Sequence, residues 1–220
     1  MFQGKTWVIH MIATKNAKPQ INTDQHAVTC AEPASLGLIG LAVAALVIGG
    51  AYAGLTHGDL MGSKSLMIPW ILMFGATSQL IASLMDFKRN NIFGATVFGT
   101  YAMTMYSIAI TLFIALFGGE GEGVEFSHYA YGLIAILFFS LIATVASLMT
   151  NKVLFAILIA VDVAVIVLIP HYLMGSNALL AGIALFVTSA LSFYGAAAIL
   201  INTMAGKTIL PLGSPLWKNS

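Results

Sequence analysis

The sequence predicts an all-α integral membrane protein with six transmembrane helices, and three observations support this fold class. Of the 220 residues, 59% are apolar and 8% are charged, whereas a soluble domain carries about 25% charged residues. Six stretches are apolar over the roughly 17 to 25 residues that a helix needs to cross a bilayer core about 30 Å thick. Basic residues concentrate in alternate connections, as the positive-inside rule requires. The net charge of +1 gives no reason to expect nucleic-acid binding.

Charged residues, glycine and proline mark the ends of each span. In chain order the spans are 36–55 after Pro33, 66–85 between Lys64 and Asp86, 92–117 between Arg89 and Gly118, 129–149 between His128 and Lys152, 153–169 before Pro170, and 178–204 between Gly175 and Gly206. These stretches are longer than ordinary strands and lack the alternation of a membrane β-barrel. Residues 1–31 are therefore predicted to form an N-terminal arm, 32–205 the membrane domain and 206–220 a C-terminal tail.

The basic residues also predict the orientation of the spans. All of them except Lys64 fall in the arm, in the tail or in the connections after the second and fourth spans. Lys64 shares the opposite side with the acidic residues Asp59, Glu120, Glu122 and Glu125. Because cytoplasmic segments are enriched in Lys and Arg, both termini are predicted to be cytoplasmic. The expected location is the cell membrane, as a multi-pass protein.

Signatures of enzymes and cofactor sites are absent from the sequence. It has no paired-histidine metal motif, no Gly-x-Ser-x-Gly turn and no phosphate-binding glycine loop. The single cysteine, Cys30, excludes an internal disulfide. We therefore expect no catalytic residue, metal or cofactor, and a function that lies within the helix bundle.

Asp162, in the fifth span, is the one charged residue within the predicted spans. Charged groups are costly in the hydrocarbon core, so Asp162 is a proton-binding group, a pore-lining group, or a carboxyl kept neutral by burial and a hydrogen bond to a neighbouring helix. No span contains Lys or Arg, which disfavours a multivalent anion as a transported solute. A small weak acid is better suited, because it can cross as the neutral acid or as an anion held by hydroxyls, amides and the positive ends of broken helices.

The third span carries a regular series of hydroxyl residues, and two other spans carry isolated polar residues. Its members are Thr96, Thr100, Thr104, Ser107 and Thr111. Their spacing of three or four residues places them on one helix face, as in the lining of a polar path. Alternatively, each hydroxyl donates to the backbone carbonyl four residues before it. Gln79 and Ser192 are further candidates for the path.

Four segments in order resemble motifs of the acetate uptake transporter family, the succinate/acetate permeases. Residues 32–38, Glu-Pro-Ala-Ser-Leu-Gly-Leu, are similar to the signature Asn-Pro-Ala-Pro-Leu-Gly-Leu and include Glu32, Pro33, Leu36 and Gly37. The other three segments are Phe74, Gly75, Ser78 and Gln79; Asp86, Lys88, Asn91, Phe93 and Gly94; and residues 206–211, Gly-Lys-Thr-Ile-Leu-Pro. The resemblance covers most of the chain.

This resemblance implies a ring of six identical subunits, each with six helices and its own pore. It also implies a hydrophobic constriction of Phe, Tyr and Leu, which falls on Leu41, Tyr101 and Val161, so that the tyrosine alone is retained. Ser192 aligns with a position associated with the choice among carboxylates. Asp162 is outside the family pattern, and Glu32 replaces the signature asparagine.

The leading hypothesis is a homo-hexameric permease or channel for acetate-like monocarboxylates in the lipid bilayer, with protons as a second partner. A channel for a neutral small solute such as urea, an amide or ammonia suits a charge-free pore equally well. A non-conducting membrane scaffold subunit is the third hypothesis, from a different functional class.

Overall fold

The computed structural model describes residues 30–56, 64–117 and 127–217. The residues outside the description are 1–29, which make up most of the predicted arm, 57–63 and 118–126 in two connections, and 218–220 at the end of the tail. The described ranges contain helices and no strand, and six helical spans are long and apolar enough to cross a membrane. These spans are α2 (Ala34–Tyr52), a composite span (Met67–Lys88), α6 (Ile92–Phe117), α7 (Ser127–Ser147), α8 (Lys152–Met174) and α9 (Leu179–Ala205). The prediction of an all-α fold with six membrane helices is confirmed.

The composite second span changes its winding along its length. It consists of α4 (Met67–Trp70), the π-helix η1 (Ile71–Ser78) and α5 (Gln79–Lys88). Two side chains at the end of η1 donate to backbone carbonyls within it, Thr77 to Leu72 at 2.8 Å and Gln79 to Gly75 at 2.6 Å. π-Helical turns are rare and often occur at functional sites. This winding was not predicted from the sequence.

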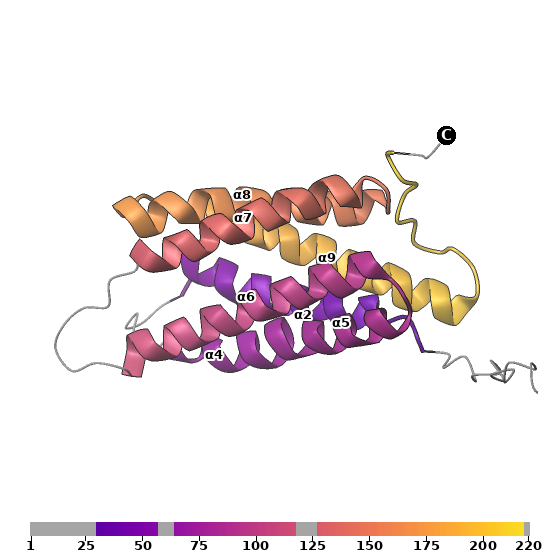
Figure 1. Cartoon of the computed structure of the whole chain (residues 1–220), viewed down its shortest axis with the longest axis horizontal. Helices are drawn as coiled ribbons and strands as arrows, with labels where there is room; N and C mark the ends of the chain where they lie inside the picture. Colours follow the sequence, from indigo (N-terminus) through magenta and orange to yellow (C-terminus); the bar gives the residue numbers. More distant parts are fainter. Residues whose placement is uncertain (1–29, 57–63, 118–126, 218–220) are drawn as a thin grey trace, which may run out of the picture.

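The helices run roughly along the long axis of the molecule, with α7 and α8 on one side and α4, α5 and α6 on the other (Figure 1). Between these groups lie α2 and α9, which pack extensively on each other. α8 packs on both α7 and α9, and α6 packs on η1 and α5, whereas α6 and α7 meet at few positions. The core consequently forms two hydrophobic clusters, and α6 contributes to both.

The fifth span ends later than predicted. α8 continues to Met174, beyond the predicted end at Ile169, and contains Pro170. Proline removes one backbone donor and crowds the carbonyl four residues earlier, but a helix can continue for one more turn after it. The helix instead ends where Gly175 adopts a left-handed conformation with φ of 68°, which glycine does without steric cost. Proline was therefore the wrong stop signal here.

The C-terminal tail packs back against the ends of three helices. The Val153 amide donates to the Leu212 carbonyl at 3.2 Å, and the Trp217 amide donates to the Leu148 carbonyl at 2.9 Å. Asn202 of α9 holds the start of this segment: its Nδ2 donates to the Leu210 carbonyl at 2.8 Å, and its Oδ1 accepts from two tail amides. The tail thereby joins the α7–α8 connection to α9.

Asn202→Leu is expected to release the tail from the bundle. The variant removes three hydrogen bonds, each of which contributes about 1 kcal/mol. Limited proteolysis of the purified protein should then cleave the tail at least tenfold faster, which corresponds to about 1.4 kcal/mol of lost docking energy. Thr203→Ala, at the exposed neighbouring position, is the matched control and should be cleaved at the parent rate. An unchanged rate in Asn202→Leu would contradict the assigned role.

Candidate functional site: a cavity between α2, α5, α6 and α8

A cavity of about 60 Å³ lies inside the bundle. Most of its wall is apolar. The apolar part consists of Ala34, Leu38 and Leu41 of α2, Phe93, Gly94, Val97 and Phe98 of α6, and Leu154, Ile157 and Leu158 of α8. The polar residues of the wall are Gln79, Asn91 and Tyr101. A cavity needs roughly 10 to 15 Å³ to hold one water molecule. This cavity therefore accommodates a molecule of a few heavy atoms.

Gln79 lines this cavity and carries an acceptor atom that has no hydrogen-bond partner. The side chain is fully buried, and its Nε2 donates to the Gly75 carbonyl at 2.6 Å. A carbonyl can only accept, so this contact fixes the amide orientation and directs Oε1 away from it. Oε1 is buried and has no hydrogen-bond partner. Because an unpaired buried acceptor costs about 1 to 3 kcal/mol, this oxygen is suited to a guest that donates a proton. Gln79 was predicted as part of the substrate path.

The three predicted constriction residues occupy different positions relative to the cavity. Leu41 and Tyr101 line it. Val161 is buried in the same hydrophobic cluster as Tyr101 but does not line the cavity. The Tyr101 ring also contacts Phe139 of α7 edge-on, with 5.8 Å between ring centroids. Tyr101 therefore joins the cavity wall to the α7 and α8 side of the bundle.

The Tyr101 hydroxyl begins a buried chain of hydrogen bonds that ends at Asp162. It lies 2.7 Å from Oγ of Ser140, and Ser140 donates to Oδ1 of Asp162. Thr144 donates to Oδ2 of Asp162 at 2.7 Å. Ser140 and Thr144 are four residues apart and thus share one face of α7. The structure places Asp162 in contact with a neighbouring helix, which was one of its three interpretations, and not in the cavity wall.

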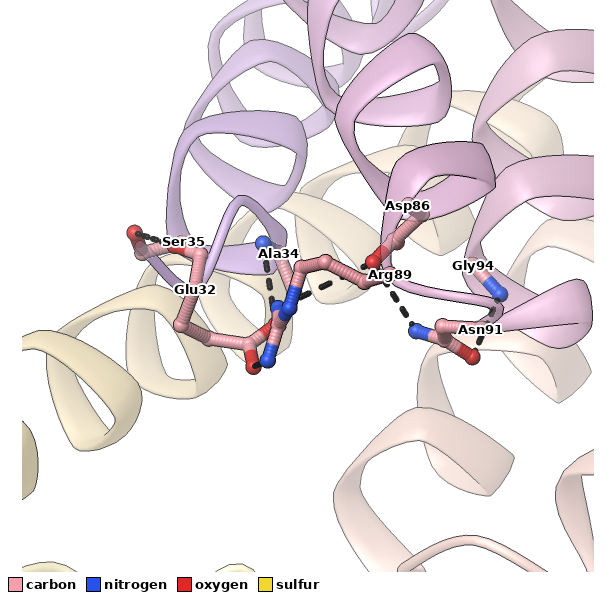
Figure 2. Close-up of polar contacts among 7 residues, drawn as sticks. All are labelled: Glu32, Ala34, Ser35, Asp86, Arg89, Asn91 and Gly94. Atoms are coloured by element: carbon pink, nitrogen blue, oxygen red, sulfur yellow. Dashed lines mark hydrogen bonds and ion pairs between the residues drawn. The ribbon is translucent and has the colours of Figure 1, made fainter. Parts of the chain in front are cut away.

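The end of the cavity near Ala34 and Asn91 carries a cluster of charged and polar residues (Figure 2). The Arg89 guanidinium forms an ion pair of 2.6 Å with Glu32, whose other oxygen accepts weakly from the Ala34 amide at 3.4 Å. The hydrogen bond between the Arg89 and Glu32 side chains raises the pKa of Arg89 above its usual range. Both partners are about one-third exposed, and such pairs contribute at most about 1 kcal/mol.

Asn91 connects this end of the cavity, called here the charged mouth (Glu32 and Arg89), to the buried carboxyl of Asp86. Its Nδ2 donates to Oδ1 of Asp86 at 3.0 Å, and its Oδ1 accepts from the Gly94 amide at 3.3 Å (Figure 2). A Cβ atom at position 94 would collide with Oδ2 of Asp86, which explains the glycine there. Arg89 and Asp86 approach at 3.8 Å. The role of Arg89 was missed because its partner, Glu32, departs from the family signature.

The remaining residues of the predicted signature support the start of α2. Pro33 is buried and precedes the helix, whereas Leu36 is exposed. A Cβ atom at Gly37 would lie 2.6 Å from the Phe98 ring, closer than carbon atoms approach without a shift. Gly37 thus allows Phe98 to form part of the cavity wall.

The predicted hydroxyl series of α6 lies outside the cavity wall, which uses other residues of the same helix. Thr96 and Ser107 are exposed, and Thr100 and Thr104 are half-buried. Thr104 and Ser107 donate to the carbonyls four residues before them, each at 2.9 Å. That is the alternative expected from the sequence.

Ser192, the predicted selectivity position, is fully buried in α9. It does not line the cavity, and its hydroxyl has no hydrogen-bond partner.

Comparisons with known proteins agree with this architecture. Residues 14–212 match the model of the GPR1/FUN34/yaaH family. A protein of Methanothermobacter thermautotrophicus that carries no functional name is 26% identical over 82% of this chain and 90% of its own length. The succinate-acetate/proton symporter SatP of Escherichia coli K12 is 24% identical over 83% of this chain and 95% of its own length.

A solved structure of the bacterial acetate channel SatP has the same fold. Its TM-score is 0.75, with 23% identity over 84% of this chain and 99% of that chain. The two named relatives are a symporter and a channel, and neither is an enzyme. Together with the six apolar helices, they support a multi-pass protein of the cell membrane. The resemblance to the acetate uptake transporters is confirmed, and the chain belongs to the GPR1/FUN34/yaaH family.

Proposed function

We propose that this chain is a permease or channel that moves acetate-like monocarboxylates across the cell membrane through the cavity described above. The observation that carries the proposal is the composition of the wall. It is apolar apart from Gln79, Tyr101 and Asn91, and contains no Lys or Arg. Without a fixed positive charge, a dicarboxylate anion would remain uncompensated inside the bundle. The E. coli relative is a succinate-acetate/proton symporter, and the acetate in its name supports a small monocarboxylate as the substrate here.

The size and the polar groups of the cavity favour a small acid in its neutral form. The volume of about 60 Å³ fits the four heavy atoms of acetate. The free Oε1 of Gln79 can accept the proton of a carboxylic acid, whereas it would repel an anionic oxygen. The substrate path in this proposal runs past Leu41, Gln79 and Tyr101, with the charged mouth at Glu32 and Arg89 as one end. With both termini cytoplasmic, as the basic residues predict, this mouth faces the cytoplasm.

We further propose that several copies of the chain assemble, with a hexamer as the expected ring. The support comes from α6. In the apolar 18-residue stretch of this helix, only 22% is buried within one subunit. Its exposed face includes the hydroxyl residues Thr96 and Ser107. Small and hydroxyl residues are enriched where membrane helices pack on one another, so this face is suited to a neighbouring subunit.

Uptake of labelled acetate into proteoliposomes tests the proposed function. Gln79→Leu keeps the approximate size of the side chain and removes the free acceptor, and is expected to reduce protein-dependent uptake about tenfold, since one hydrogen bond contributes roughly 1.4 kcal/mol. Thr203→Ala, at an exposed position of α9 outside the cavity wall, is the control and should match the parent. Empty liposomes give the unassisted diffusion of acetic acid, which is subtracted.

Two results would count against the proposal. The absence of protein-dependent uptake by intact parent protein would overturn transport of acetate. Equal uptake by Gln79→Leu would remove Gln79 from the path. Urea uptake measured in parallel separates the rival hypothesis, because the Gln79 acceptor could also bind an amide N–H; urea flux without acetate flux would favour that alternative.

A further inference from the structure

The hydrogen-bond chain from Tyr101 to Asp162 has a direction that follows from counting donors. Ser140 has one hydroxyl proton and gives it to Oδ1 of Asp162. In the contact of 2.7 Å between Tyr101 and Ser140, the tyrosine must then be the donor. An ionised carboxylate can only accept, and a phenol has a single proton. When Asp162 is ionised, Tyr101 donates its proton to Ser140. The tyrosine oxygen then has no proton to donate to a molecule in the cavity.

We propose that binding of a proton to Asp162 reverses this chain, and that Tyr101 then donates its proton to a carboxyl oxygen of the substrate in the cavity. The proposal deepens and rests on the proposed function. A proton from solvent forms an O–H bond at Oδ1 of Asp162, which now donates to Ser140. The Ser140 hydroxyl rotates and donates to the Tyr101 oxygen, and the phenolic proton rotates to its other in-plane position. No other covalent bond forms or breaks.

The packing makes Tyr101 the connection between the two sites. It lines the cavity and also ends the chain, although α6 and α7 otherwise meet at few positions. Ser140 is fully buried, and Asp162 is 5% exposed. A donor left unpaired at such depth costs about 1 to 3 kcal/mol. A proton on Oδ1 of Asp162 that donates to Ser140 requires the reversed direction, and that direction is fully paired once a substrate oxygen accepts from Tyr101.

Other titratable groups on the helices packed against α8 lie away from Asp162. Within the described residues of α6 to α9 they are Tyr106, His128, Tyr129, Tyr131, Lys152, His171, Tyr172 and Tyr194. Those on α7 and α8 are at least nine residues from Ser140 or Asp162, about 13 Å of helical rise. Tyr194 donates to the Pro211 carbonyl, and Tyr106 lies 3.1 Å from the Thr77 hydroxyl. Tyr101 is therefore the titratable group that communicates with Asp162.

The pH dependence of acetate binding by the purified full chain tests this coupling. If acetate binding is coupled to a proton on Asp162, linkage requires the apparent affinity for acetate to rise as pH falls, by up to a factor of about ten per pH unit from this group. Asp162→Asn should lose that factor, and its proton uptake on binding acetate should be lower by up to one proton. Thr144→Ala removes the other hydrogen bond to Asp162 but keeps the chain to Tyr101, so its pH dependence should persist.

Two further variants should change the affinity for acetate in opposite directions. A merely structural role of these residues would not produce that result. Ser140→Ala leaves the Tyr101 proton free, so acetate should bind at the tight, low-pH level without the Asp162 contribution. Tyr101→Phe lacks the phenolic proton, so it should bind acetate with the weak affinity of the high-pH state. Its pH dependence should also lack the contribution of Asp162. These two variants also keep the test decisive if Asp162→Asn does not fold.

The outcomes separate this proposal from the proposed function. Acetate binding and uptake by the parent, with the same pH slope and proton uptake in Asp162→Asn and Ser140→Ala, would overturn the coupling and leave transport intact. The substrate would then carry the only proton. Absence of acetate binding and uptake by the parent would overturn the proposed function itself.

Discussion

Gly40→Val is expected to prevent normal packing of the first membrane helix, with a loss of about 3 kcal/mol or more in the free energy of unfolding. A Cβ atom at this position would collide with the Ser78 hydroxyl and with the backbone carbonyl oxygen of Phe74. The second contact is with backbone in η1, which cannot rotate away as a side chain can. The helix would have to separate from the π-helical segment. Thermal unfolding in detergent, monitored by helical circular dichroism, gives the loss of stability.

Gly50 provides a matched control on the same helix. A Cβ atom there would have no neighbour within 4 Å. Gly50→Val is therefore expected to change stability by no more than about 1 kcal/mol. Equal destabilisation by the two variants would mean that loss of glycine itself, rather than the contact with η1, determines the effect.

Tyr101→Ala is expected to widen the range of substrates, with succinate uptake rising on the order of tenfold relative to acetate uptake. The ring forms part of a cavity of about 60 Å³, so its removal creates room for the additional atoms of a larger acid. The loss of one large group from a pocket typically changes discrimination by one to two orders of magnitude. Competing uptake of the two labelled acids into proteoliposomes gives this ratio directly.

Tyr106→Ala is the control for this substitution. Tyr106 is the other tyrosine of α6; it is half-buried and lies near Thr77, outside the cavity wall. Its loss should leave the ratio of succinate to acetate uptake unchanged. A similar shift in both variants would indicate general loosening of α6 and would contradict the role of Tyr101 as a constriction.

The spans could be predicted from the sequence because hydrophobicity and charge act locally. The third span was predicted at 92–117, which are the bounds of α6. The π-helical winding of η1 could not be predicted, because Ile71–Ser78 contains no local feature that separates it from an ordinary membrane helix. The end of α8 was misjudged at Pro170, since the sequence does not reveal whether a helix stops at proline or one turn later.

The candidate site was predicted only in part, for a related reason. Asp162 was identified because a charge in a membrane span is rare, whereas its partners Ser140 and Thr144 were missed because hydroxyl residues are common there. Their spacing of four residues was the available signal. For α6, periodicity grouped the hydroxyl residues Thr96 to Ser107 as a possible lining, but it could not indicate that Val97 and Tyr101 would line the cavity instead. What a helix face contacts depends on its neighbours.

The π-helical segment has a consequence for how sequences of this kind can change over time. A π-helix winds fewer degrees per residue than an α-helix, so the direction of Gln79 depends on the number of residues in Ile71–Ser78 as well as on their identity. Gain or loss of one codon within this segment would rotate Gln79 relative to Trp70 and turn its side chain away from the cavity wall. Insertions and deletions here should therefore alter substrate preference in lineages whose cavity residues are otherwise unchanged.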